Sequence, residues 1–148
     1  MAALEHAERS AHIKDDPMIK QLLAQHLIVL AVAEAEDHLE EIILAHFRAT
    51  TTPAAQNLAK SCLSSLLRSV KTSEISGFLG RLGDEYKDRF RVLMGKDEAS
   101  ETRFNNLVIN RHSVVHEAQC NVTFEELQGS IPSVHYVCES LEKSLNGG

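Results

Sequence analysis

Apolar residues recur every three or four positions along most of the 148-residue chain, and this period constrains the fold more than any other feature. Only seven glycines and three prolines interrupt it. No segment reads as a convincing strand, and no internal repeat is apparent. The sequence therefore predicts an all-α protein, and its length suits one domain around a single hydrophobic core.

Capping residues and helix breakers divide the chain into segments. The expected helices cover residues 2–14, 17–49, 53–70, 71–95, 98–117 and a last segment from 123 onward. Pro17 suits a first helical turn, and the run "TTTP" at 50–53 both stops one helix and starts the next. Thr123 and Glu126 have the spacing of a capping box.

Three glycines at 77, 80 and 83 weaken the helix expected at 71–95. They permit either close helix packing or a break, and the sequence does not decide between these. The predicted product is a single domain over residues 1–148, a bundle of four long helices plus short extra helices. Residues 1–16 and 146–148 are expected to be peripheral or flexible.

Several classes of protein are disfavoured by composition. The N-terminal 16 residues carry acids among their bases and have no apolar centre, which argues against a secretory signal. The longest apolar run, 27–33, is far shorter than the ~20 residues that span a bilayer. We therefore expect a cytoplasmic protein that does not contact a membrane.

The three cysteines, Cys62, Cys120 and Cys138, are far apart and lack a CxxC spacing. Neither a disulfide framework nor a cysteine zinc site is indicated, and we expect reduced thiols in the core. His26 lies within an apolar stretch and is expected to be a core histidine rather than a ligand.

The formal net charge of −6 argues against broad, sequence-independent binding to DNA, because such binding needs many basic contacts to phosphates. The basic residues are not evenly spread, since nine of the 15 Lys and Arg residues lie in 68–111. This segment is either a local anion site or a solvated helix with paired charges.

The stretch "NRHSVVHEA", residues 110–118, follows this basic segment and contains Arg111, His112 and His116. Histidine, with an unperturbed pKa of about 6.5, can act as a general base toward a ribose 2′-OH. Arginine offers a planar fork of donors to the charge that develops on the phosphoryl oxygens. The pair therefore has the chemistry for metal-free RNA cleavage, with 2′,3′-cyclic phosphate and 5′-OH products.

The spacing raises a geometric difficulty, because residues five apart on a straight helix point ~140° from each other. Arg111 and His116 can cooperate if the arginine side chain wraps around, if the helix ends or bends between them, or if a second subunit supplies a second copy. We favour a homodimer, because it also supplies both an acid and a base.

The segment "NNLVINRHSVVHEA" resembles the R-x4-6-H signature of HEPN domains, in which a polar residue directly follows the arginine, as His112 does. The flanking segments agree in order: "LAVAEAEDHLEEIILAHF" resembles the acidic second helix, and "TSEISGFLGRLGDEYKDRF" the segment before the motif in the RiboL-PSP-HEPN group. "VTFEELQGSIPSVHYVCESLEKSL" is similar to that group's closing helix.

The resemblance implies an HEPN-like bundle that dimerises with both motif helices at a composite cleft, and in many members a ribonuclease that needs no metal or other cofactor. Arg111 would then polarise the scissile phosphate, His116 would act as general base or acid, and His112 would support them. Asn110 would make a positioning contact, and Glu36 would be the second-helix acid that pairs with Arg111. The implied partners are RNA and an antitoxin or regulator protein, in a toxin, antiphage or stress-response setting.

Alternatives remain open at this stage. Glu117 stands where glycine is frequent in the family pattern, and an acid there could repel the phosphate. A non-catalytic HEPN module for RNA or nucleotide binding, or for dimerisation, would carry the same bundle. Arg111 and His116 could instead have purely structural roles, and His112 and His116, four residues apart on one helical face, could hold a metal.

Overall fold

The computed structural model describes residues 16–67, 70–117 and 122–147. These residues form six α-helices and no strand, which confirms the all-α prediction. The helices are α2 (Pro17–Thr50), α3 (Pro53–Leu66), α4 (Thr72–Leu82), α5 (Asp84–Met94), α6 (Glu98–Glu117) and α7 (Phe124–Asn146). The helix expected at 2–14 lies outside the described residues.

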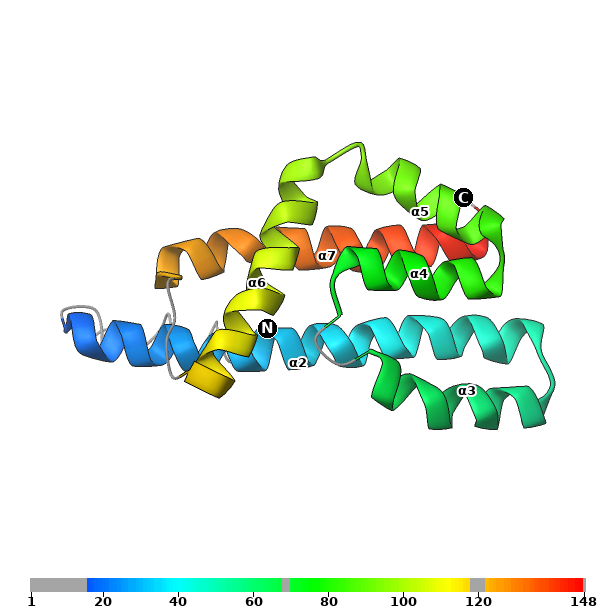
Figure 1. Cartoon of the computed structure of the whole chain (residues 1–148), viewed down its shortest axis with the longest axis horizontal. Coiled ribbons are helices and arrows are strands. Elements are labelled where there is room, and N and C mark those ends of the chain that lie inside the picture. Colours follow the sequence, from blue (N-terminus) through cyan, green and yellow to red (C-terminus); the bar gives the residue numbers. More distant parts are fainter. Residues whose placement is uncertain (1–15, 68–69, 118–121, 148) are drawn as a thin grey trace.

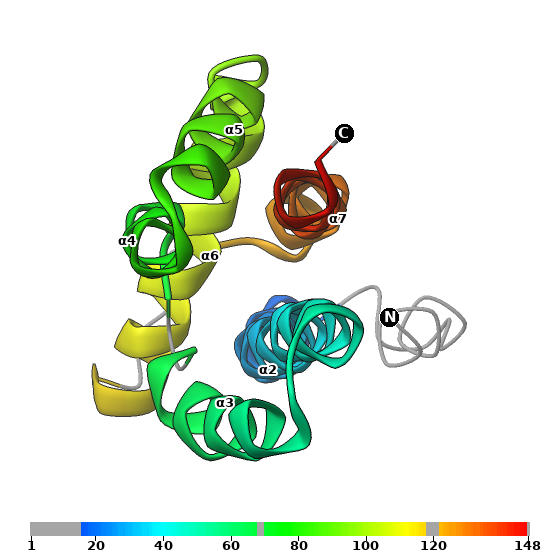
Figure 2. The same cartoon turned by 90° about the vertical axis from the view of Figure 1, so that its right-hand side faces the viewer.

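Two long helices, α2 and α7, lie side by side and form the length of the bundle (Figure 1). α6 crosses both steeply, and α3 folds back along α2. α5 packs on the C-terminal part of α7, and α4 packs against α5 (Figure 2). α6 therefore meets the bundle through α2 and α7, with part of its length extending past them.

The apolar side chains gather in two buried clusters. The larger one draws on all six helices and includes Ile43, Leu79, Phe90 and Leu141, each at most 1% exposed. The smaller cluster lies at the N-terminal half of α2. It joins four buried residues of that half, Leu27, Ile28, Ala31 and Val32, to Leu107 of α6 and Leu127 of α7. Full burial of each such side chain contributes about 1.5–3 kcal/mol, so these contacts set the packing of α6 on its neighbours.

Side-chain caps begin α2 and α7, and the one at α7 is the capping box that the sequence predicts. The Asp16 carboxylate accepts a hydrogen bond from the Met18 amide at 2.8 Å and caps α2. At α7, the Thr123 amide donates to Glu126 Oε2 at 2.8 Å, and the Glu126 amide donates to Thr123 Oγ1 at 3.2 Å. This reciprocal pair is the expected capping box, and it starts α7 at a defined residue.

The helix expected at 71–95 is interrupted at Gly83, which separates α4 from α5. Gly83 has an extended backbone, so the helical hydrogen-bond ladder stops there. Asp84 and Glu85 then occupy the first turn of α5, where acidic side chains complement the helix dipole. The sequence left open whether the glycines permit close helix packing or break the helix, and Gly83 breaks it. The preceding helix, expected at 53–70, ends earlier, at Leu66.

Two expectations about buried side chains are corrected. Cys138 is buried as expected, and burial raises the pKa of its thiol to about 12. Cys62 is exposed instead, because the outer face of α3 has no helix packed over it among the described residues. His26 is also exposed on α2 and is not a core residue. Cys120 lies outside the described residues.

α2 is long and apolar enough, by length and composition, to cross a membrane. Core helices of soluble proteins satisfy the same criteria, so this property is weak evidence on its own. In the bundle, seven of the eight buried residues of α2 belong to one or other of the two apolar clusters. Packing therefore accounts for part of the apolar character of α2, since 33% of its apolar window is buried.

A buried hydrogen-bond network attaches the start of α4 to α6. The Thr72 amide donates to Asn105 Oδ1 at 3.0 Å, and Thr72 Oγ1 donates to Glu101 Oε1 at 2.6 Å. Asn105 Nδ2 donates back to Thr72 Oγ1 at 3.0 Å. Thr72 is 2% exposed, whereas Glu101 and Asn105 are half-buried, so water has only partial access to a group that loses its partner here.

We expect Thr72→Val to lower the free energy of unfolding by about 1–2 kcal/mol, because it removes the hydroxyl that donates to Glu101 Oε1 and accepts from Asn105 Nδ2, while the backbone amide of residue 72 still donates to Asn105 Oδ1. Thr72→Ser is the matched control, since it keeps the hydroxyl and removes only a methyl group. Urea unfolding of the three proteins measures the difference. A valine variant as stable as the wild type would show that this network does not hold α4 to α6.

Candidate functional site

The segment singled out from the sequence lies on α6, whose start is firmly held. The Asp97 carboxylate accepts hydrogen bonds from the Ser100 hydroxyl at 2.7 Å and the Ser100 amide at 3.0 Å. These bonds lower the pKa of Asp97, so it stays ionised at the helix N-terminus. Phe104, Leu107 and Val108 are then buried against α2 and α7.

The second half of α6 has a different environment. None of residues 109–116 is buried, and Ile109 and Val115 are 44% and 51% exposed. α6 nevertheless continues without a break to Glu117. The helix therefore has an anchored N-terminal half and a projecting C-terminal half, and the residues predicted to act on RNA all lie on the second half (Figure 1).

Arg111 and the two histidines point in different directions from this half. Arg111 is half-buried and follows Leu107 and Val108 by four and three residues, so it continues the packed face of α6. His112 and His116 are exposed on a neighbouring flank, with ring centroids 4.4 Å apart and planes inclined by 47°. α6 does not end between Arg111 and His116. A helix end between the two residues therefore cannot explain how they would act together.

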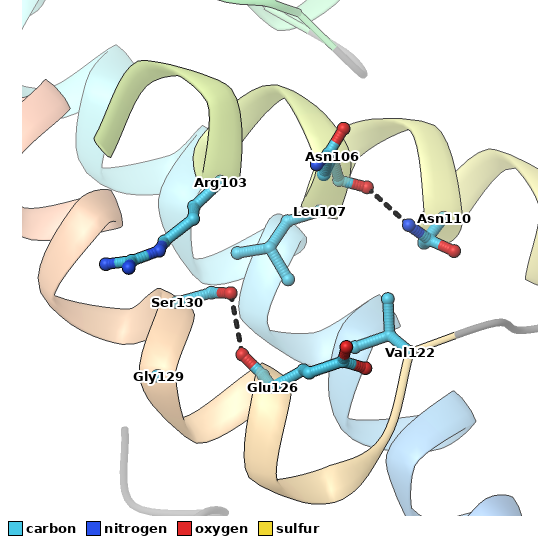
Figure 3. A pocket seen from close by; sticks show the side chains of 8 residues that line it. All are labelled: Arg103, Asn106, Leu107, Asn110, Val122, Glu126, Gly129 and Ser130. Carbon is cyan, nitrogen blue, oxygen red and sulfur yellow. Dashed lines mark hydrogen bonds between the residues drawn. The ribbon is translucent and has the colours of Figure 1, made fainter. Parts of the chain in front are cut away.

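Asn110 points in a third direction. Its Nδ2 donates to the backbone oxygen of Asn106 at 2.8 Å, one turn earlier (Figure 3). Both asparagines border a cleft between α6 and α7, which we call the α6/α7 cleft. Its volume is about 590 Å³. It is lined by Arg103, Asn106, Leu107, Asn110, Val122, Glu126, Gly129 and Ser130.

Sequence reasoning identified one of these lining residues, Asn110, and missed the rest. A signal was present, because Arg103, Asn106 and Asn110 follow the i, i+3, i+7 spacing of one helical face. The opposite wall comes from α7, and nothing in the spacing of α6 could indicate which α7 residues face it.

Glu36 lies half-buried on α2, where this helix meets α6. It borders a small gap in the packing together with Phe104 and Val108, which is one turn before Arg111. The structure thus places Glu36 against the face of α6 that Arg111 continues. The direct pairing of Glu36 with Arg111 remains a prediction.

The alternative of a metal site finds limited support in the part of the chain that the structure describes. His112 and His116 are adjacent and could supply two nitrogen ligands. No group of three or more His, Cys, Asp or Glu side chains among the described residues is arranged to hold a metal ion.

The arrangement on α6 suits proton transfer beside a bound anion. The two imidazoles are exposed, and the half-buried guanidinium of Arg111 lies on the same two turns of helix. The family model of RiboL-PSP-HEPN matches residues 3–147. The chain belongs to the RiboL-PSP-HEPN family. No curated protein and no solved structure matches it.

Membership in the RiboL-PSP-HEPN family covers nearly the whole chain, so the bundle and the helix that carries Arg111 and His116 both fall within the matched region. The coarse functional class that follows is a ribonuclease or nucleotide-binding module. The roles of individual HEPN motif residues, and any effect of Glu117, stay predictions.

Removal of metal ions distinguishes a role of His112 and His116 in proton transfer from a role as metal ligands. We expect EDTA to change neither the midpoint of thermal unfolding nor any cleavage of RNA, because two histidines alone do not make a closed tetrahedral metal site. Differential scanning calorimetry and a cleavage assay, each with and without EDTA, measure this. Loss of activity in EDTA, restored by zinc but not by magnesium, would favour a metal held by His112 and His116.

Proposed function

We propose that this protein is a metal-independent endoribonuclease that acts as a homodimer. The observation that carries the proposal is the position of Arg111, His112 and His116 on the projecting half of α6, where neither histidine has a part in the core. Exposed histidines on an otherwise well-packed bundle have no structural requirement there. Their chemistry, in a family of ribonucleases and nucleotide-binding modules, fits action on RNA.

In the proposed reaction, one imidazole removes the proton from a ribose 2′-OH, and the 2′ oxygen attacks the adjacent phosphorus. Arg111 stabilises the additional negative charge on the phosphoryl oxygens. The bond from phosphorus to the 5′ oxygen breaks, and this oxygen takes a proton from an imidazolium. The products are a 2′,3′-cyclic phosphate and a 5′-OH, and no water is consumed.

Dimerisation would complete this site. Within one chain Arg111 and His116 point ~140° apart on an unbroken helix, so a single copy does not direct both at one phosphate without a long reach by the arginine. Two copies related by a two-fold axis would place the partner's His116 near Arg111. Ile109, which shares the flank of His112 and His116 and is 44% exposed, would become buried in this contact.

We further propose a cytoplasmic setting in which the activity is controlled by an antitoxin or regulator protein, as in toxin or antiphage systems. A second candidate is a non-catalytic module that binds RNA or nucleotide. Glu117 favours this second candidate, because an acidic residue follows the motif where the family pattern often has glycine.

The test is incubation of the purified protein with total RNA in EDTA, followed by analysis of the cut ends. We expect cyclic-phosphate ends from the wild type and a rate lower by at least about a hundredfold for Arg111→Ala and for His116→Ala. Arg91→Ala and His135→Ala are matched controls, since both side chains are exposed on other helices. Intact RNA in every lane would support the non-catalytic module.

The dimer has its own test, independent of activity. We expect Ile109→Lys to shift sedimentation toward a monomer, because it places a charge in the proposed contact. Val92→Lys is the control, since Val92 is 63% exposed on α5 and far from the motif. A wild type that sediments as a monomer at working concentrations would remove the composite site.

A further inference from the structure

The α6/α7 cleft has walls of mixed chemistry. Arg103, Asn106 and Asn110 line the cleft from α6 and carry one guanidinium and two amides (Figure 3). The floor is apolar, because Leu107 and Val122 lie between the walls. Its volume of about 590 Å³ is within the range of roughly 300–1,000 Å³ found for sites that bind small molecules.

The α7 wall is fixed by local hydrogen bonds. Glu126 Oε2 accepts from the Thr123 amide and, at 3.1 Å, from the Thr123 hydroxyl. These bonds lower the pKa of Glu126, which stays ionised at neutral pH. The Ser130 hydroxyl donates to the Glu126 backbone oxygen at 2.7 Å. The wall therefore offers a carboxylate in a defined position rather than a mobile one.

These groups select against some ligands. A phosphate cluster is disfavoured, because the ionised side chain of Glu126 lines the same cleft as Arg103. An apolar ligand is disfavoured, because it would cover the amides of Asn106 and Asn110 without bonding to them. A flat, uncharged group with both donors and acceptors on its edge and apolar faces fits both walls and the floor.

A nucleobase is such a group. Asparagine amides recognise base edges that pair a donor with an acceptor, and a guanidinium plane can stack on a base. Asn110 Nδ2 uses only one of its two hydrogens in its bond to Asn106, so a second hydrogen and the Oδ1 atom are left for a ligand.

We propose that the α6/α7 cleft binds one unpaired base of the RNA strand, next to the phosphate that is cut. The link to the cut phosphate is Asn110, which lines the cleft and directly precedes Arg111. This inference rests on the proposed ribonuclease function. It adds a source of sequence preference, since the cleft and not the catalytic groups would read the base.

Gly129 provides a direct way to close the cleft. It lines the cleft and lies on an exposed face of α7, and a Cβ atom added there would meet no other atom within 4 Å. We expect a leucine at this position to take up cleft space, because its Cβ meets no neighbouring atom and its remaining atoms extend from there. Gly77 on α4 is the matched control, because it is also an exposed helical glycine with open space around an added Cβ, and it is remote from the cleft.

The experiment compares the wild type, Gly129→Leu and Gly77→Leu on a randomised single-stranded RNA library, with KM, kcat and the base frequencies around each cut as readouts. We expect Gly129→Leu to raise KM by roughly tenfold and to remove the base preference beside the cut, with Gly77→Leu unchanged. Asn106→Ala, a second cleft variant, should weaken the same preference while it leaves the packing intact.

Other outcomes separate this inference from the proposed function. Cleavage by Gly129→Leu and Asn106→Ala with the wild-type KM and base preference would overturn the proposal that the cleft binds a base, and would leave the proposed ribonuclease function unaffected. If the wild type does not cut, weaker anisotropy-measured RNA binding by Gly129→Leu than by Gly77→Leu would support the cleft in a binding module. A third outcome is that free nucleoside monophosphates bind in the cleft, while Gly129→Leu leaves KM and the base frequencies around each cut unchanged. This result would overturn the proposal that the cleft binds a base of the RNA strand.

Discussion

The packing of α2, α6 and α7 around Leu107 is the contact on which the rest of the structure depends. Leu107 is 2% exposed and lies in a buried cluster with Ile28 of α2 and Leu127 of α7. The same side chain forms part of the cleft floor and borders the packing gap beside Glu36. One apolar contact therefore sets where α6 leaves the core and which groups surround its C-terminal half.

The division of α6 into an anchored and a projecting half explains how a small bundle can present reactive groups. Burial up to Val108 fixes the axis of the helix, so the direction of each later side chain follows from the helical period. Arg111 continues the packed face, the two histidines occupy an exposed flank, and Asn110 faces the cleft. A site made from such divergent groups needs a ligand that spans them or a second copy of the chain, and an RNA strand held by a dimer meets both conditions.

Sequence reasoning succeeded where local chemistry decides the outcome. The bounds of α6 and the start of α7 followed from apolar period and capping, because these act within one or two turns. It left open whether the helix at 71–95 breaks, since a glycine permits several conformations and the packing of α5 on α7 selects one. It misjudged Cys62, because the residue type indicates burial while the exposed face of α3 depends on what packs over it.

The sequence by itself determined the all-helical class, the family and the presence of Arg111, His112 and His116 in one motif. Helical period and motif spacing depend on residues that are close together along the chain. Only the tertiary structure decided which half of α6 is exposed and which side chains form the α6/α7 cleft. The walls of that cleft are joined by the packing of two helices, and the residues that face each other across it are up to about 27 positions apart, as Arg103 and Ser130 are. No local sequence pattern predicts which residues of α6 and α7 face each other across the cleft, since this depends on the burial of Leu107 and its neighbours in a shared core.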